Sequence, residues 1–129
     1  MKFIDEIKAR AKQDVKTIVL PETKDKRTLI AAAQVLQEGT AKIVMVGDEE
    51  KIMDGAHWLD VDLTGITVVN PETSPKLEEY IQLLYEIRKA KGMTLESARE
   101  QLLNNYIMFG VMMVKAKDAD GMVAGACHA

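Results

Sequence analysis

The fold is decided by residues 17–48, which read TIVLPETKDKRTLIAAAQVLQEGTAKIVMVGD. The stretch begins with a β-branched run, Thr17–Leu20, which Pro21 ends because proline has no N–H to donate to a central strand ladder. Apolar residues then recur at intervals of three and four up to Gly39, where a left-handed helix cap belongs. A second apolar run, Ile43–Val46, follows. The sequence therefore predicts parallel strands joined by a crossover helix.

Strand-like and helical patterns continue to alternate along the rest of the chain. Further strands are predicted at Ile66–Val69 and Gly121–Ala124. Helices are predicted at residues 3–11, Glu49 to Met53, Lys76 to Lys91, Leu95 to Leu103 and Tyr106 to Lys117, with a loop or short helical turn from Gly55 to Leu63. The last helix is apolar nearly all round, which is typical of a buried helix. The fold class is α/β, a largely parallel sheet flanked by helices on both sides, in a single domain over residues 1–129.

Composition excludes several classes of protein. The chain is 47% hydrophobic and 29% charged, as in ordinary globular domains, and no apolar stretch approaches the roughly 20 residues of a membrane span. The first residues lack the apolar core of a signal peptide, and a lone cysteine, Cys127, suits a reducing compartment, so a cytoplasmic protein is expected. The net charge is −3 and aromatic residues are few, so the sequence lacks the positive charge and the stacking residues that are typical of a nucleic-acid binder.

Common catalytic motifs are absent from the sequence, which has no phosphate loop, no GxGxxG after a strand and no GxSxG. His57 and His128 have no metal-ligand spacing, so no metal site is expected. Cys127 beside His128 could be an activated nucleophile, but neighbours on a strand point to opposite faces, which favours a buried structural cysteine. Asp25 and Arg27 could line a site after the first strand, although helix caps and first-turn charges are the commoner roles.

Two predicted strands end in similar turns, since residues 17–23 read TIVLPET and residues 67–73 read TVVNPET. The flanking residues do not match, so these are two strands with similar proline turns rather than an internal repeat. If the strands are parallel, both turns lie at one edge of the sheet. Threonine hydroxyls and backbone N–H groups there could face an anion.

Arg88 is the strongest candidate for ligand binding on its position alone. It continues the apolar stripe of the predicted helix, four residues beyond Leu84. An arginine on a core-facing side must be paired, reach the edge of the core or face a ligand cleft. The alternative is an internal ion pair or a solvated helix end, which Lys89 and Lys91 favour through the helix dipole.

Four separated segments carry a resemblance to a known family. They are residues 17–27, residues 85–94 (YEIRKAKGMT), residues 109–114 (FGVMMV) and residues 120–126 (DGMVAGA). In this order and spacing they resemble the amino-terminal portion of the phosphate acetyltransferases. The resemblance implies a two-domain fold like that of isocitrate and isopropylmalate dehydrogenases, more than twice this length, with the active site between the domains. The chain is then expected to be an incomplete amino-terminal part of the first domain, with some apolar surface exposed or covered by another copy.

The resemblance also implies a function, the reversible transfer of an acetyl group between acetyl phosphate and coenzyme A. Coenzyme A, acetyl-CoA, acetyl phosphate and phosphate would be its partners, no cofactor or metal would be needed, and a homodimer is expected. Arg88 matches an arginine that the family uses for coenzyme A binding, and Gly125 and His128 match parts of a loop in the cleft. The family's base and phosphate-binding residues have no counterpart here, so no catalytic residue is assigned.

Other functions remain open at this point. The chain could be a catalytically silent domain that keeps coenzyme A affinity or a subunit contact, and phosphate butyryltransferases belong to the same superfamily. Taken alone, the 129 residues are expected to be inactive, because positioning and electrostatic stabilisation supply most of the rate in such transfers.

Overall fold

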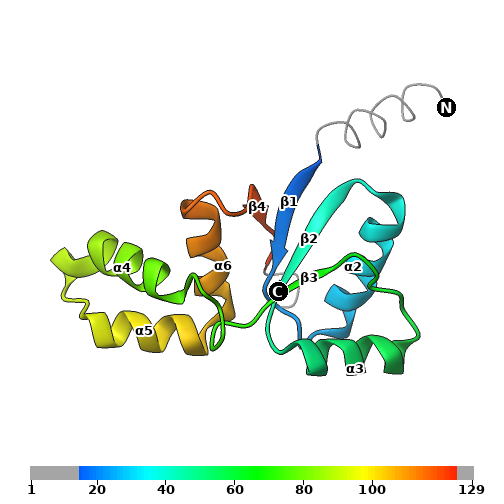
Figure 1. Ribbon diagram of the computed structural model, residues 1–129, viewed down its shortest axis with the longest axis horizontal. Coiled ribbons are helices and arrows are strands. Elements are labelled where there is room, and N and C mark those ends of the chain that lie inside the picture. Colours follow the sequence, from blue (N-terminus) through cyan, green and yellow to red (C-terminus); the bar gives the residue numbers. More distant parts are fainter. Residues whose placement is uncertain (1–14, 125–129) are drawn as a thin grey trace.

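The computed structural model describes residues 15–124, whose four strands form one parallel sheet in the order β3-β2-β1-β4 (Figure 1). The strands are β1 (Lys16–Leu20), β2 (Ala41–Val46), β3 (Thr67–Val69) and β4 (Gly121–Met122). Every pairing is parallel, so the prediction that these four segments share one sheet is confirmed. β4 ends two residues earlier than predicted, although Val123 N still donates to Val19 O at 3.0 Å.

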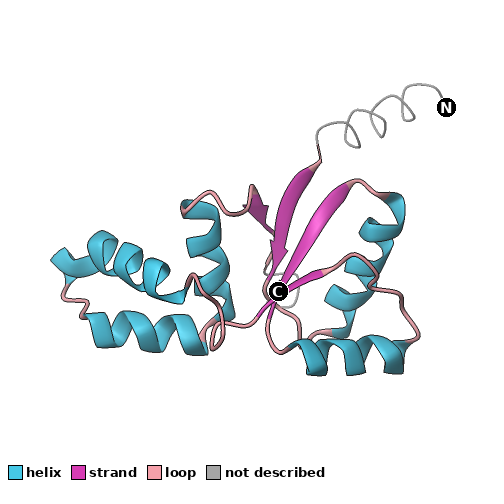
Figure 2. Cartoon of the chain, in the orientation of Figure 1, coloured by secondary structure: helices cyan, strands magenta, loops and turns pink. Residues whose placement is uncertain are grey.

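Helices cover both faces of the sheet (Figure 2). On one face lie α2 (Lys26–Glu38) and α3 (Glu49–Leu59). On the other lie α4 (Leu77–Arg88), the 3₁₀ turn η1 (Lys89–Lys91), α5 (Leu95–Asn104) and α6 (Tyr106–Lys115). The predicted α/β class with helices on both sides is therefore confirmed.

Alternation along the strands divides the core into two clusters, because successive side chains of a strand point to opposite faces. Val19 of β1 and Val44 and Val46 of β2 pack with α4, α5 and α6. Leu20, Ile43 and Met45 pack with α2 and α3. The apolar runs read from the sequence are thus buried on both sides, as expected for central parallel strands.

The crossover helix α2 has the ends that the sequence predicts. The Asp25 side chain caps its start by accepting from Arg27 N at 2.8 Å. Gly39 ends it with φ of 70°, in the left-handed region. The assignment of Asp25 to a helix cap is confirmed.

The helix after β2 is longer than predicted. α3 continues through Gly55 to Leu59, where a loop or a short helical turn was expected, and Asp60 ends it with φ of 56°. Ile52 and Ala56 extend its buried stripe, and their packing on the sheet offsets the cost of a glycine within a helix, about 1 kcal/mol. The prediction of a helix ending at Met53 is wrong for this reason.

The α4–α5 hairpin extends away from the sheet, and α6 lies between it and the strands (Figure 1). α6 buries Phe109, Gly110, Met112 and Met113, which confirms that the all-apolar segment is a core helix. Within residues 15–124, no helix combines the length and the apolarity that crossing a membrane requires. The helix predicted at residues 3–11 lies outside the described residues.

Candidate functional site

The turns that follow β1, β2 and β3 lie together at the carboxyl edge of the sheet, because the three strands are parallel. These turns are Pro21–Asp25, Gly47–Asp48 and Asn70–Thr73. Open α/β sheets bind ligands beyond the carboxyl ends of their strands. The prediction that the two proline turns share one edge is confirmed, and this edge is the candidate site.

Thr23 anchors the first turn to the second. It is buried, and its Oγ1 donates to Val46 O at 2.9 Å. In the third turn, Thr73 Oγ1 donates to Asn70 O at 3.5 Å. Both hydroxyls therefore bond to main-chain oxygens of the protein, so they do not form the anion-facing rim that the sequence suggested.

Two hollows flank Thr23 and share Thr23, Lys24 and Tyr106 in their linings. The first, about 780 Å³, lies between the Pro21–Asp25 turn and the start of α6. The second, about 440 Å³, lies between α2 and α3. The carboxyl edge thus carries two adjoining hollows.

The first hollow is rich in hydrogen-bond acceptors. Its lining includes the carboxylates of Glu22, Asp25 and Glu72, with Lys24 as the cation. At the start of α6, Asn105 Oδ1 accepts from Ile107 N at 3.1 Å and from Met108 N at 3.2 Å, so those donors do not face the hollow. This lining does not suit a phosphate.

The second hollow has the opposite character. Its charged lining residues are Lys24, Lys26, Lys51 and Asp48. The Asp48 side chain accepts from Lys51 N at 3.2 Å and so caps α3. The lysine amines therefore dominate this hollow, which suits an anionic ligand.

Arg88 lies away from both hollows. It is the last residue of α4 and is exposed, and the connection between α4 and α5 lies at the end of the hairpin far from the sheet (Figure 1). Leu77, Tyr80, Ile81 and Leu84 form the buried stripe as predicted. Of the alternatives that the sequence left open for Arg88, the structure shows the solvated helix end, because α4 extends beyond the surface on which it packs. Its guanidinium makes no hydrogen bond or ion pair with any residue of 15–124, which leaves it available to a ligand.

The other candidates from the sequence have separate places. Arg27 forms an ion pair with Asp25 at 3.1 Å, so the two act on the start of α2. His57 is exposed in the last turn of α3. Gly125, Cys127 and His128 lie outside the described residues. Among the residues that the structure does describe, no cluster of three or more histidine, cysteine or acidic side chains could hold a metal ion.

Sequence reasoning missed the lysines and Trp58 of the second hollow. Lys51, Gly55 and Trp58 line it from successive turns of α3. Their spacing of four and three residues is helical and would place them on one side of a helix. The signal was hidden because the helix was expected to end at Met53.

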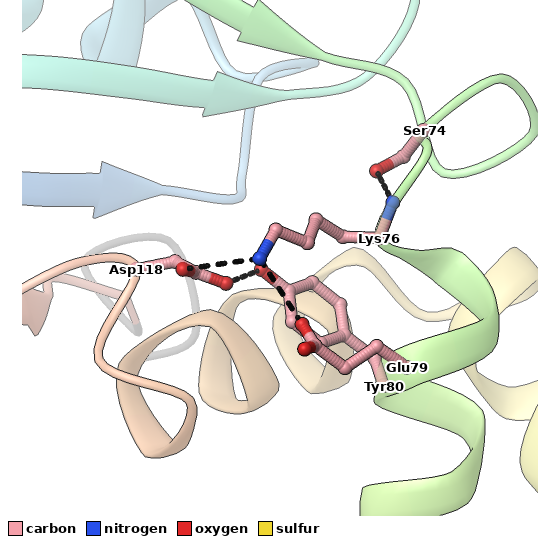
Figure 3. Close-up of polar contacts among 5 residues, drawn as sticks. All are labelled: Ser74, Lys76, Glu79, Tyr80 and Asp118. Carbon is pink, nitrogen blue, oxygen red and sulfur yellow. Dashed lines mark hydrogen bonds and ion pairs between the residues drawn. The ribbon is translucent and has the colours of Figure 1, made fainter.

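A polar network fixes the start of α4 beside the segment between α6 and β4 (Figure 3). The Tyr80 hydroxyl donates to Asp118 Oδ2, and Lys76 Nζ lies 3.7 Å from Asp118 Oδ1. Lys76 Nζ also donates to Glu79 Oε2 at 3.2 Å, and Lys76 N donates to Ser74 Oγ at 3.1 Å. The network thus ties the turn after β3 to the approach to β4.

Replacing Tyr80 by phenylalanine is expected to lower the free energy of unfolding by about 1–2 kcal/mol at pH 7, through loss of a hydrogen bond to a carboxylate that is partly exposed. Burial, and then the Asp118 carboxylate, raise the pKa of Tyr80 above its ordinary value of about 10. The neutral phenol therefore contributes stability that is full below pH 10 and is lost as the pH rises above 10.

Urea unfolding at pH 7 and at pH 11 checks this expectation. The parent should lose more stability between the two pH values than Tyr80→Phe. An equal loss in the two proteins would show that Tyr80 ionisation is not coupled to folding.

The family model described as phosphate acetyl/butaryl transferase matches residues 2–129. The phosphate acetyltransferase of Acetivibrio thermocellus is 49% identical over 128 residues, which are 99% of this chain and 38% of that protein. The enzyme of the same name from Clostridium acetobutylicum is 44% identical over 128 residues, again 99% of this chain and 38% of that protein.

Solved structures agree with the sequence comparisons. The EutD phosphotransacetylase from Staphylococcus aureus superposes with a TM-score of 0.81 at 38% identity, covering 96% of this chain and 38% of that chain. A phosphotransacetylase from Streptococcus pyogenes also gives a TM-score of 0.81, at 34% identity over 90% of this chain and 35% of that chain. The chain thus spans well under half the length of the relatives it matches.

Proposed function

Because the chain belongs to the phosphate acetyl/butaryl transferase family, we propose that the protein transfers an acetyl group reversibly between acetyl phosphate and coenzyme A. The observation that carries the proposal is the family match over residues 2–129, with 49% identity to a phosphate acetyltransferase. The chain spans 38% of that relative, so activity, substrates and partners of the whole protein are part of the proposal. The proposal further includes that the protein is cytoplasmic, forms a homodimer, acts in acetate metabolism and uses no cofactor.

In the proposed reaction the thiol of coenzyme A attacks the acetyl carbonyl of acetyl phosphate. A base takes the thiol proton, a carbon–sulfur bond forms, and the carbon–oxygen bond to phosphate breaks, which releases inorganic phosphate. Hydrogen-bond donors and cations stabilise the oxyanion of the tetrahedral intermediate and the leaving phosphate. We assign none of the described residues to the base.

In the proposed reaction, the role of this chain's described residues is to bind coenzyme A. The Arg88 guanidinium can offer paired N–H donors to a phosphate of coenzyme A, and it has no competing partner among residues 15–124. Its exposure at the end of α4 leaves it accessible to a large ligand. Gly125 and His128 are proposed, on the resemblance alone, as parts of a loop in the cleft.

In the whole protein, replacing Arg88 by alanine is expected to raise the Michaelis constant for coenzyme A by roughly tenfold or more, since a hydrogen bond to a charged group contributes about 1.5–3 kcal/mol. The constant for acetyl phosphate should change little. Initial rates of acetyl-CoA formation, measured with each substrate varied in turn, check both expectations.

Lys91→Ala is the matched control, because it removes an exposed cation from the neighbouring 3₁₀ turn. It should leave both Michaelis constants near the parent values. If Arg88→Ala impairs both substrates equally, or neither, the proposed role of Arg88 is wrong.

Two further measurements test the function itself. Rates with butyryl phosphate in place of acetyl phosphate separate an acetyltransferase from a butyryltransferase. Coenzyme A binding without any acyl transfer by the whole protein would instead support a silent coenzyme A-binding domain and contradict the proposed activity.

A further inference from the structure

The hollow between α2 and α3 combines an apolar floor with a rim of cations. Its volume of about 440 Å³ is within the usual range for small-molecule sites. Leu29 and Ile52 lie in its floor and are buried, while Lys24, Lys26 and Lys51 are exposed at its rim. The lysines come from the turn after β1, from α2 and from α3, so three separate segments converge on it.

Trp58 forms a wall of the same hollow and is 77% exposed. It is the single tryptophan of the chain. Lys26 Nζ lies 4.8 Å from the centre of its ring, within the range of a cation–π contact. A large aromatic surface is thus open to solvent directly beside an ammonium group, and both belong to one concave site.

We propose that this hollow binds an adenine nucleotide, with the base stacked on the Trp58 indole and the phosphates among the lysine amines. A planar base has the π-face that stacking on tryptophan needs, and phosphate oxygens accept from ammonium groups. Neither a neutral aromatic molecule nor free phosphate would use both features. The site is distinct from Arg88, and the inference does not depend on acyl transfer.

The nearby acidic groups do not cancel this positive rim. Asp48 is the acidic residue of the lining, and its carboxylate accepts from Lys51 N. Glu49 and Glu50 belong to the first turn of α3 and are not part of the lining. Asp25, in the preceding turn, pairs with Arg27.

The chain offers a direct measurement, because its single tryptophan lies in the proposed site. ADP is the probe, and quenching of Trp58 fluorescence reports its binding. Saturable quenching is expected, with adenosine alone and inorganic phosphate alone binding at least tenfold more weakly by this signal. Absence of saturable quenching at millimolar ADP would overturn the proposal.

Lys51→Glu is the critical variant, and roughly tenfold weaker ADP binding is expected. Glutamate at this third position of α3, after the Asp48 cap, is favourable to the helix, so the variant is expected to fold. Circular dichroism checks this. The matched control is Lys42→Glu, an exposed lysine of β2 outside the hollow, which should bind ADP as the parent does. Equal affinity in Lys51→Glu and the parent would contradict the proposal.

Trp58→Ala, measured by calorimetry, tests the stacking. It should weaken ADP binding by roughly tenfold, in line with the loss of one stacking partner. Unchanged affinity would overturn the placement of the base on Trp58.

The adenine nucleotide could be a free one or the nucleotide end of coenzyme A, and competition distinguishes these sources. If coenzyme A displaces ADP and its own quenching is reduced by Lys51→Glu, coenzyme A is the source, and its phosphates then lie at this hollow rather than at Arg88. If coenzyme A leaves the ADP titration unchanged, the site serves free nucleotides. In either case Arg88→Ala should leave ADP affinity unchanged, and a matching loss would contradict a site distinct from Arg88.

Discussion

Replacing Phe109 by alanine is expected to lower the free energy of unfolding by about 3–5 kcal/mol. Phe109 is fully buried in α6, where its ring meets the edge of Tyr80 with centroids 5.1 Å apart and an interplanar angle of 75°. The substitution leaves a cavity at the junction of α4, α6 and the sheet and removes this aromatic contact. The loss is a large share of the 5–15 kcal/mol that typically stabilises a domain.

Urea unfolding followed by far-ultraviolet circular dichroism measures this loss. Ile87→Ala is the control, because Ile87 is 46% exposed on the same layer of helices. Its effect should stay within about 0.5 kcal/mol. Equal losses in the two variants would show that α6 does not hold the core in the way described.

Gly47→Ala is expected to lower the free energy of unfolding by about 3 kcal/mol. Gly47 follows β2 with φ of 155°, which side chains rarely adopt. A Cβ atom there would lie 2.8 Å from Thr23 Oγ1 and 3.3 Å from Ile52 Cδ1. The methyl group would therefore disturb the bond from Thr23 to Val46 O, which holds two turns of the carboxyl edge together.

Gly39→Ala separates backbone strain from this crowding. Gly39 has φ of 70°, but within residues 15–124 only its neighbours along the chain lie within 4 Å of the position that a Cβ would take. Its substitution should cost about 1 kcal/mol, from the left-handed conformation alone. Thermal and urea unfolding of the two variants give the comparison. A Gly47→Ala loss no larger than that of Gly39→Ala would mean that Thr23 moves aside freely.

The sheet could be predicted from the sequence because its strands are short β-branched runs buried on both sides, as at Thr17–Leu20 and Ile43–Val46. Their period and their proline or glycine ends are local properties. The length of α3, by contrast, could not be predicted from its local sequence. Gly55 is typical of a break in a helix, and its tolerance here depends on packing across to Leu29, which a Cβ at Gly55 would approach to 3.0 Å.

The candidate site was predicted less well, for a related reason. The stripe that led to Arg88 is real as far as Leu84, but periodicity carries no information on where the partner surface ends. Trp58 was missed because hydrophobic residues are expected inside, and sequence alone does not show that this indole is exposed. Arg88 as a coenzyme A ligand remains a prediction.

The pairing of β1 with β4 has a consequence for the order of assembly. Thr17 N donates to Asp120 Oδ2 across a separation of 103 residues. Closing a loop of that length costs roughly 4 kcal/mol in chain entropy, which the two-residue strand β4 cannot offset by itself. Once α6 is packed on the sheet, only the segment from Lys115 to Gly121 has to close. Gly110 of α6 leaves the space that Met122 fills, since a Cβ there would lie 2.7 Å from Met122 Sδ. We therefore expect β1 to pair with β4 only after α6 has packed on the sheet, because this packing lowers the chain-entropy cost of the pairing.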